Sequence, residues 1–89
     1  MAVLIRHRSD GMTTALYDEI SPPLIADLKT QPGFLLHVTY EDAAGSFVVG
    51  EVWESQEQHD SWFNAKVKPN LPFEISQEVT ALHSVHKPS

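Results

Sequence analysis

The chain has 89 residues, the length of one domain, taken here as residues 1–89, and a domain this small buries only about 60 to 65% of the surface that its unfolded chain exposes. Hydrophobic residues make up 42% and charged residues 20%, an ordinary globular composition, and no run of about 18 apolar residues predicts a membrane span. The formal charge of −6 disfavours nucleic acid as a partner, and the lack of cysteine excludes disulfides, thiolate metal sites and cysteine nucleophiles.

The first segment predicts a strand. Ala2–Arg8 begins with apolar and β-branched residues and ends with polar ones. Only five residues precede Arg6, which is too few for the apolar core of a secretory signal, so we expect a cytoplasmic protein. Asp10 and Gly11 then predict a turn.

The following segment predicts two separate helical pieces. Thr13 or Thr14 is suited to cap the first piece. Because proline disfavours the helical conformation in the residue before it and suits the first helical position, we expect Ser21 to cap a second piece that starts at Pro22. The apolar residues at helical spacing are Leu16, Tyr17, Ile20, Leu24, Ile25 and Leu28.

Two strands and another helix are predicted next. Phe34–Tyr40 and Ser46–Trp53 are rich in β-branched and aromatic residues, with the loop EDAAG between them. The helix opens at Ser55, where Gln58 three residues later completes a capping box. Its inward stripe consists of Trp62, Phe63 and Val67, with His59 one turn earlier, and His59 is expected at the edge of the helix, partly in contact with water.

The end of the chain predicts a fourth strand. Pro69, Leu71 and Pro72 break the helical pattern, and Glu78–His86 has the composition of a strand. The order strand, helix, strand, strand, helix, strand predicts a ferredoxin-like α+β fold, a βαββαβ unit with a four-stranded antiparallel sheet and two helices on one face.

The other face of this sheet is more apolar than a solvated face normally is. We therefore expect a homodimer in which two sheets pack against each other. The residues expected on that face are Phe34, Leu36, Val38, Tyr40, Val48, Gly50 and Val52.

The register of the hairpin decides which side chains face each other, since a slip of one residue exchanges the two faces. With a three-residue loop, Ala43-Ala44-Gly45, glycine occupies the left-handed position that such loops require, and His37 faces Glu51. With a four-residue loop, His37 faces Gly50 instead. We favour the first closure because of the position of Gly45.

In the favoured register, the face beneath the helices holds one imidazole and one carboxylate in an apolar chamber. Burial disfavours both charges of His37 and Glu51 while their pairing favours both, so their titrations are coupled, as in acid–base catalysis. A histidine facing a glutamate is equally compatible with a purely structural pair. The strand residues expected on this face are Leu35, His37, Thr39, Phe47, Val49, Glu51 and Trp53, with Trp62, Phe63 and Tyr17 closing over them.

We expect no metal site. His83 and His86 are three residues apart on a predicted strand and so point to opposite faces, and a site would need His7, His37 or His83 to converge. The sequence has no glycine-rich phosphate loop and no serine elbow.

The stretches EVWESQEQHDSWF, Glu51–Phe63, and GFLLH, Gly33–His37, resemble the dimeric α+β barrel superfamily, in particular small proteins similar to the antibiotic biosynthesis monooxygenases. The Glu-x-Trp pattern is the most telling part of the resemblance, which spans most of the chain. It implies a homodimer with a ligand pocket in each subunit between sheet and helices. Glu51, Trp53 and His37 match positions where the family carries glutamate, an aromatic residue and a polar or aromatic residue.

Two departures from the family pattern restrict the function that the resemblance implies. Trp62 stands where many relatives have a helix histidine, and the first strand lacks the asparagine of the haem-degrading branch, so haem chemistry is disfavoured. The quinone-forming branch surrounds its substrate with asparagine, tryptophan, tyrosine and arginine, of which only the tryptophan has an evident match.

Our leading hypothesis is a cofactor-independent monooxygenase that acts on an aromatic or polyketide-like small molecule without metal or flavin. His37 would be the base and Glu51 would orient its ring, in a pocket from which water is excluded. The pocket walls would be Trp53, Trp62, Phe63 and Tyr17. The alternatives are a cyclase or isomerase, which needs the same base but no oxygen, and a non-catalytic dimer that binds a small hydrophobic molecule.

Overall fold

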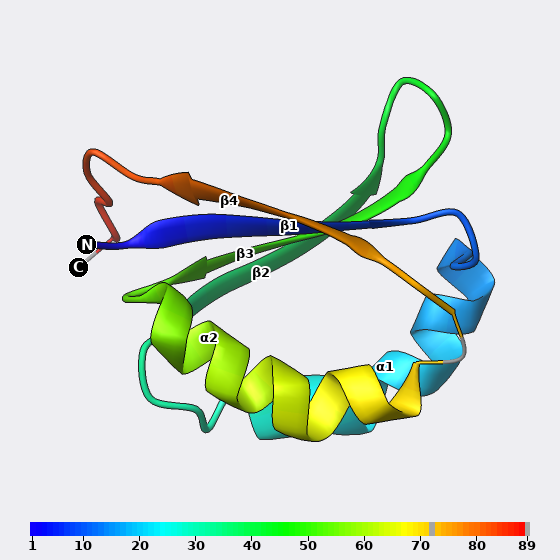
Figure 1. The fold of residues 1–89 in the computed structure, drawn as a ribbon, viewed down its shortest axis with the longest axis horizontal. Helices are drawn as coiled ribbons and strands as arrows, with labels where there is room; N and C mark the ends of the chain where they lie inside the picture. Colours follow the sequence, from blue (N-terminus) through cyan, green and yellow to red (C-terminus); the bar gives the residue numbers. More distant parts are fainter. Residues whose placement is uncertain (72, 89) are drawn as a thin grey trace.

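The structure is a computed structural model that describes residues 1–71 and 73–88. The main elements are β1 (Val3–Ser9), α1 (Thr14–Leu28), β2 (Phe34–Glu41), β3 (Phe47–Trp53), α2 (Gln56–Trp62) and β4 (Ser76–Ala81). The four strands form one sheet of order β2-β3-β1-β4 with antiparallel neighbours, and both helices lie on the same side of it (Figure 1). The ferredoxin-like α+β prediction is therefore confirmed, while the predicted role of Pro72 in ending the helical pattern lies outside the described residues.

The fourth strand is shorter than predicted. β4 pairs with β1 as far as Ala81, which faces Val3, the first residue of β1. Beyond this pair the Leu82 backbone makes one more hydrogen bond, 2.9 Å long, to Ala2. The predicted strand Glu78–His86 was therefore wrong at both ends, because β4 starts two residues earlier, at Ser76, and ends at Ala81, where its partner strand β1 begins.

The first helix is continuous, and the predicted break at Pro22 was wrong. Thr13 caps it by accepting a hydrogen bond of 3.1 Å from the Leu16 backbone, as predicted. The two consecutive prolines lack backbone donors, but the carbonyls left without these bonds belong to Asp18 and Glu19, which are exposed. Because water can satisfy those carbonyls, the helix passes through the prolines and extends to Leu28.

The second helix begins as predicted. The Ser55 side chain accepts a hydrogen bond of 3.2 Å from the Gln58 backbone. After α2 the chain continues as a π-helical turn, Phe63–Val67, and a short 3-10 turn, Lys68–Asn70. Gly33, just before β2, has a φ of +85°, and a Cβ there would collide with the Gln58 side chain. The start of β2 is therefore held close against α2.

The hairpin between β2 and β3 has the predicted three-residue loop. The Asp42 backbone donates to the Ser46 carbonyl at 3.0 Å, and Gly45 has a φ of +85°. In this register His37 lies directly opposite Glu51, so the prediction is confirmed and the four-residue closure is wrong.

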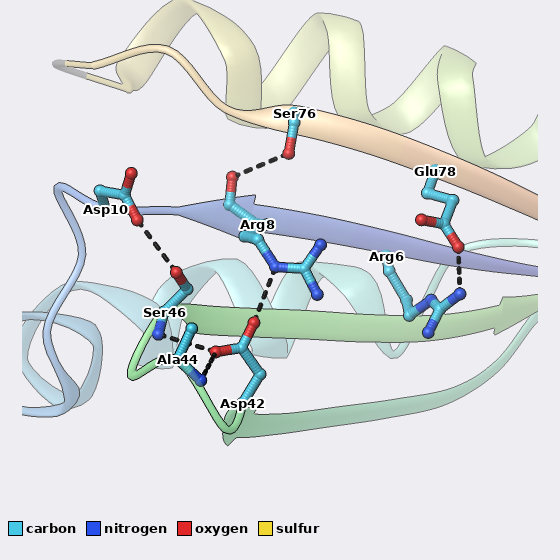
Figure 2. A network of polar contacts seen from close by, with 8 residues as sticks. All are labelled: Arg6, Arg8, Asp10, Asp42, Ala44, Ser46, Ser76 and Glu78. Carbon is cyan, nitrogen blue, oxygen red and sulfur yellow. Dashed lines mark hydrogen bonds and ion pairs between the residues drawn. The ribbon is translucent and has the colours of Figure 1, made fainter.

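Polar contacts fix this loop from the side of β1 (Figure 2). One oxygen of the Asp42 carboxylate accepts from the backbones of Ala44 and Ser46 at 2.9 and 3.0 Å, and the other accepts from Arg8 Nε at 2.9 Å. The backbone hydrogen bond from Ser46 is the largest factor that lowers the pKa of Asp42. The Ser46 hydroxyl also donates to Asp10 at 3.0 Å. The loop that sets the register is thus anchored by a carboxylate that stays ionised.

A β-bulge alters the pairing at the start of β2. Phe34 faces Trp53 while Leu36 faces Val52, so Leu35 is an extra residue without a partner on β3. The Phe34 and Trp53 rings meet edge to face with centroids 5.6 Å apart. The predictions that Leu35 faces Trp53 and that Phe34 lies on the outer face were wrong, because the bulge turns the larger Phe34 side chain into the core.

The core lies between the sheet and the helices and contains Val3, Ile5, Leu28, Trp53, Trp62 and Phe63. On the opposite face Leu36, Val38 and Tyr40 are 53%, 44% and 43% exposed, which leaves apolar surface bare in the single chain. The homodimer remains a prediction. Among the described residues, no helix has both the length and the apolar character needed to cross a membrane.

Candidate functional site

A continuous chain of hydrogen bonds runs from the core through Trp53, Glu51 and His37 to Tyr17. The Trp53 indole N–H donates to Glu51 Oε1 at 2.9 Å, and Glu51 Oε2 lies 2.6 Å from His37 Nδ1. His37 Nε2 lies 2.6 Å from the Tyr17 hydroxyl. The sheet register supplies the His37–Glu51 contact, and α1 brings Tyr17 down onto it.

Glu51 is the anionic member of this chain. Burial opposes its charge, but the hydrogen bonds from His37 and Trp53, together with the charge of His37, keep the pKa of Glu51 below its ordinary value. The ionised carboxylate accepts the Nδ1–H of His37. The other ring nitrogen, Nε2, faces the Tyr17 hydroxyl.

Tyr17 is the neutral end of the chain. Burial raises the pKa of Tyr17, hydrogen bonding with Ser21 opposes this effect, and the negative charge of Glu51 reinforces it. Tyr17 therefore keeps its proton at neutral pH.

The Tyr17 end of this series of hydrogen bonds reaches a cavity of about 100 Å³ between the sheet and the helices. Its walls are mainly apolar: Met12, Ile20, Leu24, Ile25, Phe47, Val49, Trp62, Phe63, Val67, Leu71, Phe73 and Ile75. The polar residues that reach it are His7, Ser9, Tyr17, Ser21, His37 and Glu51. A mostly apolar cavity with a few convergent polar groups is typical of a small-molecule site.

Five of the six residues predicted for the site line this cavity: Tyr17, His37, Glu51, Trp62 and Phe63. Trp53 is fully buried behind Glu51, so its contact is with the carboxylate and not with the cavity. The Trp62 indole donates to Asp27 on α1 at 2.8 Å, which joins the two helices over the cavity.

Two further histidines belong to the same region, and the sequence reasoning missed both. His7 is 6% exposed, lines the cavity and contacts Gln77 through Nε2 at 2.9 Å. His7 shares one face of β1 with the apolar Val3 and Ile5, and this two-residue spacing was the signal in the sequence that His7 points inward. His59 has no exposed surface, so its expected place at a wet helix edge was wrong. The His59 ring stacks on the ring of Phe63, one helical turn later, with centroids 5.3 Å apart, and both side chains are buried.

No cation site is evident in the described part of the chain. Within residues 1–71 and 73–88, no three histidine, aspartate or glutamate side chains are arranged to hold a metal ion.

The family model for antibiotic biosynthesis monooxygenases matches residues 13–67, which is more than half of the chain. The protein therefore belongs to this family. No curated protein sequence matches the chain well enough to count as a relative.

Solved structures share the fold over nearly the whole chain. A haem-degrading protein from Mycobacterium tuberculosis superposes with a TM-score of 0.72 at 18% identity, covering 99% of this chain and 98% of that one. SnoaB, a cofactor-independent oxygenase from Streptomyces nogalater, has a TM-score of 0.64 at 14% identity, covering 94% of each chain. The monooxygenase ActVA-Orf6 from Streptomyces coelicolor, in complex with nanaomycin D, has a TM-score of 0.63 at 18% identity, covering 99% and 91%. At these identities the likeness shows the fold alone.

Proposed function

We propose that the protein is an oxygenase that removes a phenolic or enolic proton from an aromatic or polyketide-like small molecule, without metal or flavin, and lets the resulting anion react with dioxygen. The observation that carries this proposal is the hydrogen-bond chain that ends in the Tyr17 hydroxyl at an apolar cavity. Membership of the monooxygenase family supports it. The description of SnoaB as a cofactor-independent oxygenase supports it as well.

In this mechanism Tyr17 relays the proton and His37 is the base. A substrate hydroxyl in the cavity gives its proton to the Tyr17 oxygen as Tyr17 passes its own proton to His37 Nε2. The imidazolium that forms lies 2.6 Å from the ionised Glu51, which stabilises its charge. Since the pKa of Tyr17 is raised, Tyr17 takes up the substrate proton as it gives up its own, and its phenolate does not accumulate.

Trp53 is a positioning residue in this scheme. Its indole N–H occupies Glu51 Oε1 at 2.9 Å, so the other carboxylate oxygen is directed at His37. The oriented Oε2 would then hold the proton on His37 Nδ1 and leave Nε2 to accept a proton.

The second stage takes place on the substrate anion. Its electron pair forms a carbon–oxygen bond to dioxygen, and the imidazolium of His37 returns a proton to give a hydroperoxide. Where the attacked carbon still bears hydrogen, loss of water leaves a carbonyl, so that one CH₂ and one O₂ become one C=O and one H₂O. An apolar cavity favours this stage because it excludes competing proton donors.

A small ketone with one acidic methylene, which would become a second carbonyl, is a suitable probe for a cavity of about 100 Å³. Oxygen uptake and the absorbance of the dicarbonyl product are followed together for the wild type, His37→Gln and Tyr17→Phe. We expect a loss of about 100-fold or more for His37→Gln, the usual range for a general base, and a smaller loss for Tyr17→Phe. Thr39→Val, on the same strand but outside the cavity lining, is the control.

Three outcomes would reject the proposal. A folded His37→Gln variant with the wild-type rate would end the assignment of the base. Turnover without oxygen uptake would favour the cyclase or isomerase alternative. Binding of the probe without conversion by any variant would favour the non-catalytic alternative.

A further inference from the structure

His59 is a buried imidazole that the proposed mechanism does not use. Its ring has no exposed surface, and its Nδ1 lies 2.8 Å from the carboxylate of Asp60. Its Nε2 is buried and has no hydrogen-bond partner among the described residues. Leaving a buried nitrogen without a partner destabilises a fold, so such a group calls for a functional explanation.

The nearest polar ring is that of His7, on the other side of the same small cluster. The two imidazole centroids are 5.1 Å apart and the rings are tilted by 38°. Phe63 stacks on both of them, with centroids 4.4 Å from His7 and 5.3 Å from His59. Trp53 closes the cluster with a perpendicular contact to His59 at 5.7 Å. Aromatic rings therefore separate the two imidazoles from water.

The hydrogen bonds of the two rings define their tautomers. His59 Nδ1 carries the proton that it donates to Asp60, which leaves the lone pair on Nε2. His7 Nε2 carries the proton that it donates to the Gln77 side-chain oxygen at 2.9 Å, which leaves the lone pair on Nδ1. Each of two neighbouring buried imidazoles thus keeps one nitrogen able to take a proton.

We propose that His7 and His59 form a second proton-holding site next to the cavity, in which the two imidazoles share a single proton. At a centroid separation of 5.1 Å, two imidazole rings can place one nitrogen each within the length of an N–H···N bond when those nitrogens face each other. The site goes beyond the proposed function, because it does not depend on the reaction at Tyr17 and His37. It would supply a counter-charge to a ligand with an anionic oxygen at the His7 end of the cavity.

The surroundings of His7 lower its pKa, so that protonation of both rings at once is disfavoured. Burial is the main factor that lowers the pKa of His7, the Gln77 contact opposes it, and the charge of His59 lowers the pKa further. The negative charges of Glu51 and Asp60 act in the opposite direction.

The pair also connects water to the cavity. The Asp60 side chain is 37% exposed and contacts His59, whereas His7 lines the cavity. With a proton shared between the two rings, as proposed, Asp60, His59 and His7 would form a path from the solvent to the cavity.

Nitrogen-detected NMR of the imidazole rings between pH 4 and 8 tests the pair in the ligand-free protein. In the wild type, the signals of His7 and His59 should move together, in macroscopic steps separated by more than about one pH unit. In His59→Gln, His7 should titrate in one step at a different midpoint, and in His7→Gln the converse should hold for His59. The backbone amide spectrum shows for each variant whether the fold is kept, and the two variants serve as alternatives if one fails to fold.

The proposal is overturned if His7 titrates with the same midpoint and shape in His59→Gln as in the wild type. It is also overturned if neither ring gains a proton above pH 4 while the amide spectrum stays native. Both results leave the function proposed for Tyr17 and His37 untouched, so the two proposals can fail separately.

Discussion

Replacing Glu51 with glutamine tests whether its carboxylate is an ionised, paired group in the folded protein. The glutamine keeps the shape of the side chain, but its amide has only one acceptor oxygen, so of the two hydrogen bonds at 2.6 and 2.9 Å one becomes neutral and the other loses its acceptor. A hydrogen bond to a charged group contributes about 1.5–3 kcal/mol and a neutral one about 0.5–1.5 kcal/mol. Because the neutral side chain also avoids the cost of burying a charge, we expect the free energy of unfolding to fall by about 1–2 kcal/mol.

The pKa shift of Glu51 also predicts how the difference in free energy of unfolding depends on pH. The pKa of Glu51 is lowered from its ordinary value of 4.5 in the folded protein, so the unfolded chain binds more protons in the interval between the two values. The stabilisation is fully present above pH 4.5 and is lost as the pH falls through the pKa of the folded state. The difference between the wild type and Glu51→Gln should therefore shrink in acid.

Urea unfolding followed by tryptophan fluorescence measures this difference. With a slope of about 1 kcal/mol per molar urea, the midpoint of Glu51→Gln at pH 7 should be lower by about 1–2 M. Glu54→Gln, an exposed glutamate three residues away, is the control and should change the free energy by less than about 0.5 kcal/mol. Equal midpoints at pH 7, or a difference that stays constant down to pH 3, would refute the assignment of an ionised pair.

Three other predictions follow from the fold. Gly33→Ala should lower the free energy of unfolding by about 2–3 kcal/mol, since position 33 combines a positive φ with a collision against Gln58. Gly45→Ala has the same φ of +85° but open space around it, so it should lower the free energy of unfolding by only about 1 kcal/mol, and thermal unfolding of both variants checks this difference. Sedimentation at micromolar concentration should show a homodimer, and Val38→Asp on the exposed apolar face should give a folded monomer; a wild-type monomer would contradict the dimer. The raised pKa of Tyr17 means that stability should fall as the pH rises above 10, and Tyr17→Phe should remove this loss, which alkaline denaturation curves of both proteins can check.

The hairpin is where the sequence was most informative about the candidate site. Gly45 is the last residue of the loop, and its φ of +85° is a conformation that glycine adopts without strain. That single requirement sets the register, and the register places His37 opposite Glu51. The period-two and helical patterns likewise predict the order of the four strands and the two helical regions, because burial on one face follows from the order of apolar residues, but they do not predict the continuity of α1 or the ends of β4.

Only the tertiary structure decided the contacts between elements and the places where the backbone departs from its local conformational preference. The 2.6 Å contact of Tyr17 with His37 depends on how α1 packs on the sheet, and helical spacing alone does not specify it. The continuous helix through Pro22 depends on which backbone carbonyls are exposed to water. The bulge before Leu36 depends on the packing of the Phe34 ring against Trp53. Local sequence therefore determined the elements and the His37–Glu51 pair, whereas packing between distant segments turned that pair into a chain leading to a cavity.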